Sequence, residues 1–342
     1  MALTFVGLSI MPRQPFYQFF NTFIMELIIH PCPKKNALKL REIAHYSSNI
    51  YGVFPKLTIA QCDQMMQEQQ SLQRHVLTKN DYEDLSSRLC DFISKCNITQ
   101  RGCIWFSFHM GPYHILIHLL NKLNGNLAVL VSRQVYDDYN PELRSHRLGK
   151  KISLINVQDA AAIWKIKHAM QSGIRLLVYI DGNMGSGLQL KRTVQLSLGQ
   201  LCWSLSTVLA DWASCYQIPV VPIWMFIDEG KRPQLKLGQP HAVTDATAFV
   251  KDCFLQFYQD LLRYPAQWKG WLFVHHDVQP TPRNLEKGRR PVCYPDFMPY
   301  PLPDQYYLLE RSTGLFYAVD AVLYQQICKD MKHELILKFG LI

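Results

Sequence analysis

The sequence predicts an α/β fold: a largely parallel central sheet flanked by helices, followed by a small C-terminal β-hairpin plus helix. Three observations carry this prediction. Five short apolar runs are typical of buried strands, helical patterns lie between them, and a proline-rich stretch precedes a hairpin signal near the end. The chain has 342 residues, 48% of them apolar, which excludes a disordered or collagen-like protein and allows one large domain or two small ones.

The predicted strands are runs of aliphatic and aromatic residues without helical spacing. They cover Cys103–Met110, Leu127–Ser132, Ile152–Val157, Leu176–Ile180 and Val220–Phe226. Apolar residues at spacings of three and four predict the helices. These cover Ser47–Leu89, His114–Leu123, Pro141–Gly149, Asp159–Gln171, Gly199–Tyr216 and Ala246–Tyr264. We expect Asp159 to cap the start of its helix and Gly173 to follow the end of it.

The pattern changes near the C-terminus. The range Val278–Asp304 holds seven of the 19 prolines and reads as an extended linker. The apolar runs Tyr306–Leu309 and Leu315–Val319 flank a glycine-bearing turn, which predicts a hairpin, and a helical pattern follows over Ala321–Phe339. We therefore divide the chain into an N-terminal segment (1–36), an α/β domain (37–278), a proline-rich linker (279–304) and a C-terminal extension (305–342).

Charge and cysteine content limit the partners and the location. Lysine and arginine (36) exceed aspartate and glutamate (27), and a net charge of +9 suits an anionic partner such as a phospholipid surface or an acidic carrier protein. The basic residues are scattered, which argues against nucleic acid. The ten cysteines form no C-x-x-C pair, so we expect buried free thiols in a reducing compartment.

The beginning of the chain carries no signal for export or for membrane insertion. Met1–Ile10 lacks the features of a secretory leader, and the apolar stretch Phe16–Ile29 is too short to span a bilayer. We expect a cytoplasmic protein and leave open a peripheral position on the inner face of the cytoplasmic membrane.

The sharpest local feature is the sequence S-F-H-M-G-P-Y-H over residues 107–114. Here His109 leaves the C-terminal end of a predicted strand just before a helix, the edge at which open α/β sheets bind ligands. Gly111 and Pro112 fix a tight turn that holds His109 at the rim of the sheet. The alternative is an incidental histidine at a strand end.

Other chemical patterns are weaker. His109, His114 and His118 have a spacing that can bind zinc, but no H-E-x-x-H glutamate and no further ligand accompany them, so we expect no metal site. The weaker alternative is a metal-dependent hydrolase built on these three histidines. The glycine-rich stretch from Asp181 through Asn183 to residue 187 lacks the G-K-[ST] ending of a phosphate loop and reads as a substrate loop. No G-x-S-x-G motif supports a serine nucleophile.

Several blocks, in the same order, resemble the bacterial late lipid A acyltransferase family, part of the lysophospholipid acyltransferase-like superfamily. Gly102–Ile115 is similar to the opening block of that family, which reads approximately H-F-G-N-W-E. The other similar blocks are Leu127–Arg133, Arg144–Gly149 (RSHRLG), Leu176–Asp181 (LLVYID), Leu209–Trp224 (LADWASCYQIPVVPIW) and Tyr264–Trp271 (YPAQWKGW). Together the resemblance covers Ala37–Val278.

Such enzymes pass a fatty acyl group from an acyl carrier protein or coenzyme A thioester to a hydroxyl of a lipid. The resemblance therefore implies an acyltransferase without a bound cofactor, whose co-substrate is the thioester and whose general base is His109. It also implies substrate-binding residues at the matching positions. These are Arg133, Arg144 and Arg147, which would bind phosphate of the donor, and the alternative is that they are solvated surface arginines. From the turn after His109 and from the glycine-rich stretch, we also expect Gly111 and Asn183 to bind substrate.

The chain departs from the family at one important position. Five residues after the histidine, where the family has a carboxylate to orient the base, this chain has His114. Three outcomes are open. Asp181 takes the place of the missing carboxylate, the acceptor is an amine that needs less help, or the protein is a catalytically degenerate homologue that only binds an acyl chain or an acyl carrier protein.

The substitution at His114 favours a specialised enzyme of lipid or acylated natural-product biosynthesis, with an amine or hydroxyl acceptor. Within the C-terminal extension, Leu308–Ile327 is faintly similar to small peptide-binding chaperone domains. That resemblance implies a peptide or a carrier-bound amino acid as the acceptor, and the alternative is a C-terminal brace packed on the main domain.

Overall fold

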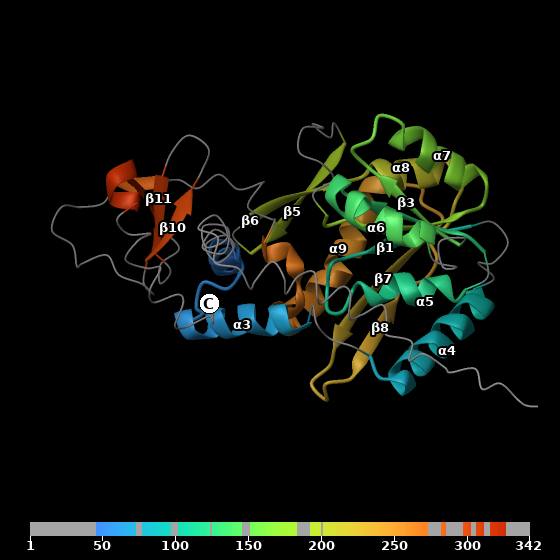
Figure 1. Ribbon diagram of the computed structural model, residues 1–342, viewed down its shortest axis with the longest axis horizontal. Helices are drawn as coiled ribbons and strands as arrows, with labels where there is room; N and C mark the ends of the chain where they lie inside the picture. Colours follow the sequence, from blue (N-terminus) through green and yellow to red (C-terminus); the bar gives the residue numbers. More distant parts are fainter. Residues whose placement is uncertain are drawn as a thin grey trace, which may run out of the picture.

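A six-stranded sheet in the order β3-β2-β4-β1-β7-β8 forms the centre of the protein (Figure 1). The computed structural model describes residues 46–72, 77–96, 102–123, 125–145, 151–182, 192–199, 201–272, 282–284, 297–301, 306–310 and 315–325. The expectations for residues 1–36 lie outside these ranges, as do Arg147, Asn183 and residues 326–339.

The first five strands of this sheet are parallel, as the alternation of strands and helices predicts. The sixth, β8, is antiparallel to β7. The strands are β1 (Ile104–Ser107), β2 (Leu127–Val131), β3 (Ile152–Asn156), β4 (Arg175–Tyr179), β7 (Val220–Ile227) and β8 (Pro233–Leu237). The strand β1 lies inside the sheet between β4 and β7, so the residues that follow it reach the middle of the sheet edge.

Helices cover both faces of the sheet, because alternate strand residues point to opposite sides. On one face, Phe106 and Val178 pack in a core with α7 (Ala162–Gln171), α8 (Val208–Tyr216) and α9 (Ala246–Arg263). On the other, Trp105 and Leu177 pack with α4 (Lys79–Cys96) and α5 (Ile115–Asn121). The predicted fold class is thus confirmed as mixed α/β with a largely parallel, helix-flanked sheet.

The helical region predicted over Ser47–Leu89 is split into separate helices. A first helix ends at residue 53, and α3 (Ile59–Leu72) and α4 follow it. The helix predicted over Pro141–Gly149 instead begins at Arg133, directly after β2, as α6 (Arg133–Ser145). Ser132 starts it, since its hydroxyl accepts the N–H of Val135 and its carbonyl accepts that of Tyr136.

The helix prediction over Gly199–Tyr216 is wrong in its first half. Residues 201–206 form β6 (Leu201–Ser206), which pairs with β5 (Thr193–Leu198) in an antiparallel hairpin. Leu201, Trp203 and Leu205 alternate with small polar or sulfur-bearing residues, a period of two that indicates a strand. The helix α8 begins only at Val208.

The end of α7 is as predicted. Gly173 adopts φ +68°, its N–H reaches the carbonyl of Met170, and the N–H of Ile174 reaches that of Ala169. This is a Schellman ending, which favours glycine. The prediction for the other end is wrong: the N-cap residue is Ala161, which makes no side-chain cap bond, and Asp159 accepts the N–H of Ala161 in the turn before the helix.

The predicted C-terminal hairpin is present as β11 (Tyr306–Glu310) and β12 (Leu315–Val319). Two further strands, β9 (Pro282–Asn284) and β10 (Phe297–Pro301), lie inside the range expected to be an extended linker and complete a sheet in the order β10-β11-β12-β9. Figure 1 shows this sheet on the left. Its residues Leu308 and Tyr317 belong to the same buried cluster as α9.

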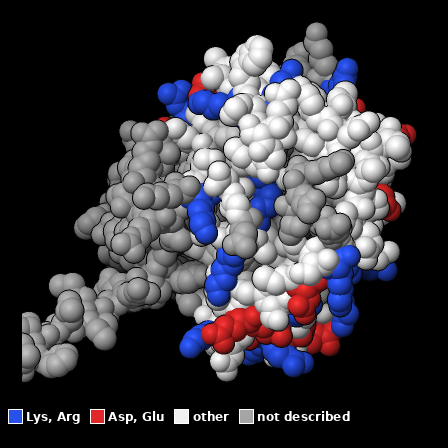
Figure 2. Space-filling view, turned by 90° about the vertical axis from the view of Figure 1, so that its right-hand side faces the viewer, with Lys and Arg blue, Asp and Glu red and all other residues white. Residues whose placement is uncertain are grey.

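The surface charges, the cysteines and the helix lengths bear on the expected partners and location. Acidic and basic side chains intermingle along the lower part of the face in Figure 2, and a few basic side chains stand near its centre. Six cysteines with described side chains are free, with Cys62, Cys103 and Cys253 buried as expected, whereas Cys90 and Cys215 are exposed. Among the described helices, none has the length and apolar character needed to cross a bilayer.

Candidate active site

The structure brings His109 and Asp181 together at the C-terminal edge of the central sheet. Strands β1 and β4 are parallel neighbours, and their last residues, Ser107 and Tyr179, are paired in register. His109 and Asp181 each lie two residues beyond these paired ends. The register of the sheet therefore dictates that the two side chains meet.

The Asp181 carboxylate is fully buried and accepts hydrogen bonds from two other residues. Its Oδ1 lies 2.9 Å from Nδ1 of the His109 ring, and the backbone N–H of His109 donates to both oxygens, at 2.9 and 3.1 Å. The indole Nε1 of Trp268 donates to Oδ2 at 2.7 Å. A buried carboxylate needs such partners, because desolvation of an unpaired charge is costly.

This contact determines the tautomer of His109. A carboxylate can only accept, so the proton of the neutral imidazole sits on Nδ1 and the lone pair on Nε2. Nε2 has no hydrogen-bond partner in the described part of the chain, and the side chain is 25% exposed. An imidazole oriented by a buried carboxylate, with its second nitrogen free, can take a proton from a substrate.

Aromatic rings fix the plane of the imidazole. The ring of Tyr179 stacks on His109 with centroids 4.4 Å apart, and the ring of Tyr113 stands nearly perpendicular to it at 4.8 Å. Gly182 packs close beside the ring without crowding it, because only an added Cβ would approach Cε1 of His109 to 3.3 Å. Burial raises the pKa of Tyr179 well above 10.0, so its hydroxyl stays protonated and donates to the carbonyl of Tyr113 at 2.8 Å.

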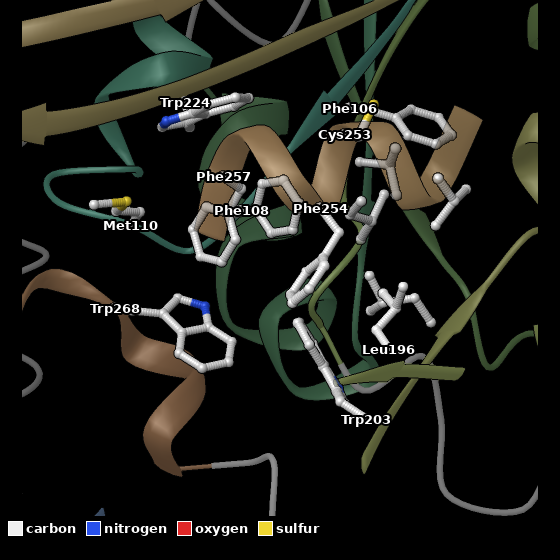
Figure 3. Close-up of a cluster of buried hydrophobic side chains, with 14 of the residues drawn as sticks. Phe106, Phe108, Met110, Leu196, Trp203, Trp224, Cys253, Phe254, Phe257 and Trp268 are labelled. Carbon is white, nitrogen blue, oxygen red and sulfur yellow. The ribbon is translucent and has the colours of Figure 1, made fainter. Parts of the chain in front are cut away.

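The turn that carries His109 is anchored on both sides. Phe108 points into the core, stacked on Phe257 at 3.8 Å, and Figure 3 shows it between Trp224 and Trp268. Gly111 has φ +56°, and a Cβ there would lie 2.7 Å from the carbonyl oxygen of Met225. Glycine is required at this position for both reasons.

A segment far away in the sequence completes the site. The short helical turns Pro265–Gln267 and Lys269–Leu272 follow α9. They form hydrogen bonds with the turn that carries His109 (residues 108–112), called the histidine turn below. The N–H of Gly111 donates to the carbonyl of Gln267 at 2.8 Å, and the N–H of Lys269 donates to that of His109 at 2.9 Å. The amide of Gln267 bonds both the N–H and the carbonyl of Ile227 at 2.7 Å, which ties the segment to β7.

Compared with known protein families and with curated proteins, the chain matches none. The geometry of the site is therefore the main basis for a functional conclusion.

The predicted site residues lie at different distances from this centre. His114 is the N-cap residue of α5, and its ring centroid lies 5.9 Å from that of Tyr113, but the partner of the His109 ring is Asp181. Arg133 follows β2 at the same sheet edge and points to solvent, 73% exposed, with Asp137 3.7 Å away. Arg144 lies in α6, with its side chain outside the described part, and Arg147 and Asn183 lie outside it altogether.

Sequence reasoning missed the contributions of Trp268, Lys269, Tyr113 and Tyr179. The available signal was the block YPAQWKGW, which stood out only for its resemblance to the acyltransferase family. Within this block, the side chains of Gln267 and Trp268 bond Ile227 and Asp181, and Lys269 Nζ donates to the hydroxyl of Tyr113 at 3.0 Å.

The three histidines of the zinc-like spacing have different surroundings. Burial lowers the pKa of His118 from 6.5 to about 4, because the charged imidazolium would lose its hydration. Within the described ranges, no group of three histidine, cysteine, aspartate or glutamate side chains is placed to hold a metal ion.

Proposed function

We propose that this protein is an acyltransferase that moves an acyl group from a carrier-protein or coenzyme A thioester to an amine or hydroxyl acceptor. The single observation that carries the proposal is the pair of His109 and Asp181 at the C-terminal edge of a largely parallel sheet, where Nε2 of His109 has no partner among the described residues. Ligands of open α/β sheets bind at this edge.

In the proposed reaction, Nε2 of His109 takes the proton of the acceptor as its nitrogen or oxygen attacks the thioester carbonyl. Asp181 stabilises the imidazolium that forms, since its carboxylate is buried beside Nδ1. The tetrahedral intermediate then collapses, the carbon–sulfur bond breaks, and the imidazolium returns the proton to the leaving thiolate. General base catalysis of this kind contributes about 10²–10⁴-fold to the rate.

The resemblance of several blocks to late lipid A acyltransferases supports the same reaction class. The family carboxylate is replaced by His114, but the His109 ring nevertheless has a carboxylate partner in Asp181. That replacement is therefore no reason to treat the site as degenerate, and catalysis is favoured over the binding-only alternative.

The donor and acceptor classes follow from the same proposal. A net charge of +9 suits an acidic acyl carrier protein or the phosphates of coenzyme A. The acceptor is a lipid, peptide or small amine of lipid or natural-product biosynthesis, met in the cytoplasm or at the inner face of its membrane.

The test is release of free thiol from a panel of acyl-carrier and acyl-coenzyme A thioesters, with amine, hydroxyl and peptide acceptors added in turn. We expect acceptor-dependent release by the wild type and its loss in His109→Ala. The matched control is His168→Ala, which removes an exposed histidine of α7. Undiminished release by His109→Ala, or no release by the wild type with any pair, would contradict the proposal.

A further inference from the structure

Lys269 and Tyr113 form a polar pair beside His109. This pair takes no part in the proposed proton transfer. The ammonium of Lys269 donates to the hydroxyl oxygen of Tyr113 at 3.0 Å, and both side chains are half-buried. The two residues come from segments 156 positions apart in the sequence. This long-range contact beside His109 suggests a chemical role for the pair.

Both residues are held in place by the site itself. The backbone N–H of Lys269 donates to the carbonyl of His109, and the carbonyl of Tyr113 accepts the hydroxyl of Tyr179. The ring of Tyr113 stands perpendicular to those of His109 and Tyr179, at centroid distances of 4.8 and 5.5 Å. The Tyr113 hydroxyl is thus a preorganised group next to the base.

The direction of the hydrogen bond leaves the proton of Tyr113 available. An ammonium has only donors, so Lys269 must donate and the oxygen of Tyr113 must accept. The hydroxyl hydrogen points elsewhere, and in the described part of the chain it has no other partner. A donated hydrogen bond from a cation also polarises the O–H bond and makes it a stronger donor.

The proposed reaction needs such a donor. Attack on the thioester places negative charge on the carbonyl oxygen, and acyl-transfer enzymes stabilise this oxyanion with preorganised donors, often backbone N–H groups. In the histidine turn those groups are already used. The N–H groups of His109, Met110 and Gly111 bond Asp181, the carbonyl of Phe108 and the carbonyl of Gln267, and Pro112 has none.

We propose that the hydroxyl of Tyr113, polarised by the ammonium of Lys269, donates a hydrogen bond to the oxyanion of the tetrahedral intermediate. This inference rests on the proposed acyl transfer. As the new bond to the acceptor forms and its proton passes to His109, the π electrons of the thioester carbonyl move onto oxygen, which accepts the Tyr113 hydrogen. When the carbon–sulfur bond breaks, those electrons re-form the carbonyl and Tyr113 keeps its proton.

The experiment compares Tyr113→Phe, Lys269→Met and the double variant with the wild type in the thiol-release assay. We expect kcat to fall by roughly 10²-fold in Tyr113→Phe, with KM changed by less than about threefold, because the lost bond exists only in the transition state. Lys269→Met should lower kcat in the same way. The kcat of the double variant should be little lower than that of Tyr113→Phe, because both changes act on the same hydrogen bond, the one that the Tyr113 hydroxyl donates.

Two matched controls separate this effect from general damage. Tyr258→Phe removes the hydroxyl of another half-buried tyrosine, whose ring stacks on Phe254, and Lys251→Met removes an exposed lysine of the same helix. Both should keep wild-type kcat. Lys269→Arg, which retains a cation, should recover part of the activity that Lys269→Met loses, at an unchanged melting temperature.

The outcomes distinguish this inference from the proposed function. If the wild type releases thiol, His109→Ala does not, and Tyr113→Phe keeps kcat within about threefold of the wild type, the oxyanion role is overturned and acyl transfer stands. A large rise in KM without a fall in kcat would also overturn it, because Tyr113 would then bind the ground state. If the wild type releases no thiol with any pair, both proposals fall together.

Discussion

The indole nitrogen of Trp268 donates a 2.7 Å hydrogen bond to Oδ2 of Asp181, although 87 residues separate the two. The carboxylate oxygen Oδ1 faces His109 Nδ1, so the two side chains hold Asp181 from both sides. Trp268 is itself fixed in the core, with its ring against Phe257 and Trp271. The orientation of the proposed base thus depends on the aromatic core beneath it.

We expect Trp268→Phe to lower kcat by about tenfold, because the carboxylate loses one of the donors that fix it. The free energy of unfolding should also fall, by about 2 kcal/mol or more, since a buried oxygen is left without its partner and a smaller ring fills the site. Thiol release and urea unfolding measure the two effects. The control is Trp271→Phe, which removes the indole bond to the Pro265 carbonyl and should reduce stability without a comparable fall in kcat.

Asp181→Asn tests which residue orients His109. The amide offers the ring one acceptor at most and no negative charge, so we expect kcat to fall by about 10³–10⁴-fold, as for the orienting acid of an analogous triad. His114→Gln should change kcat by less than about fivefold, because His114 is not the partner of the His109 ring. The reverse order of effects, measured by thiol release with folding checked by circular dichroism, would assign the orienting role to His114.

Gly270→Ala should destabilise the segment that carries Trp268 and Lys269. A Cβ at this position would run into the indole of Trp268, which belongs to the rigid core. We expect a loss of about 2 kcal/mol or more in urea unfolding, together with reduced kcat, because Trp268 must shift away from Asp181. Gly230→Ala is the control, since its nearest contact is the Asp228 carboxylate at 3.3 Å, and it should be close to neutral.

The parts of the fold that sequence reasoning predicted are those with strong local patterns. The apolar runs of β2 and β3 lie within one residue of their predicted bounds, and Gly173 ends α7 as expected. The hairpin of β5 and β6 was missed, because apolar residues at a period of two run without a break into those of the following helix at Val208.

Only the part of the site that follows from positions at strand ends was predictable from the sequence. His109 and Asp181 follow parallel strands, so their ends had to share one edge, but the adjacency of β1 and β4 is a property of the whole sheet. Trp268 and Lys269 reach the site through a turn after α9, and no local pattern states which earlier residue such a turn will bond. Long-range contacts of this kind need the three-dimensional structure.

The stability of the protein should decrease in mild acid because of His118. Burial holds the pKa of this residue at about 4 in the folded state, against 6.5 ordinarily. Between these values the unfolded chain binds the proton more readily, so the stabilisation present above pH 6.5 is lost as the pH falls toward 4. At pH 5 this loss is about 2 kcal/mol.

Urea unfolding at pH 7 and pH 5 measures this loss. The free energy of unfolding of His118→Gln should fall less than that of the wild type, whereas His168→Gln, at an exposed position in α7, should show the full fall. Equal drops in all three proteins would mean that His118 does not become charged on unfolding in this range.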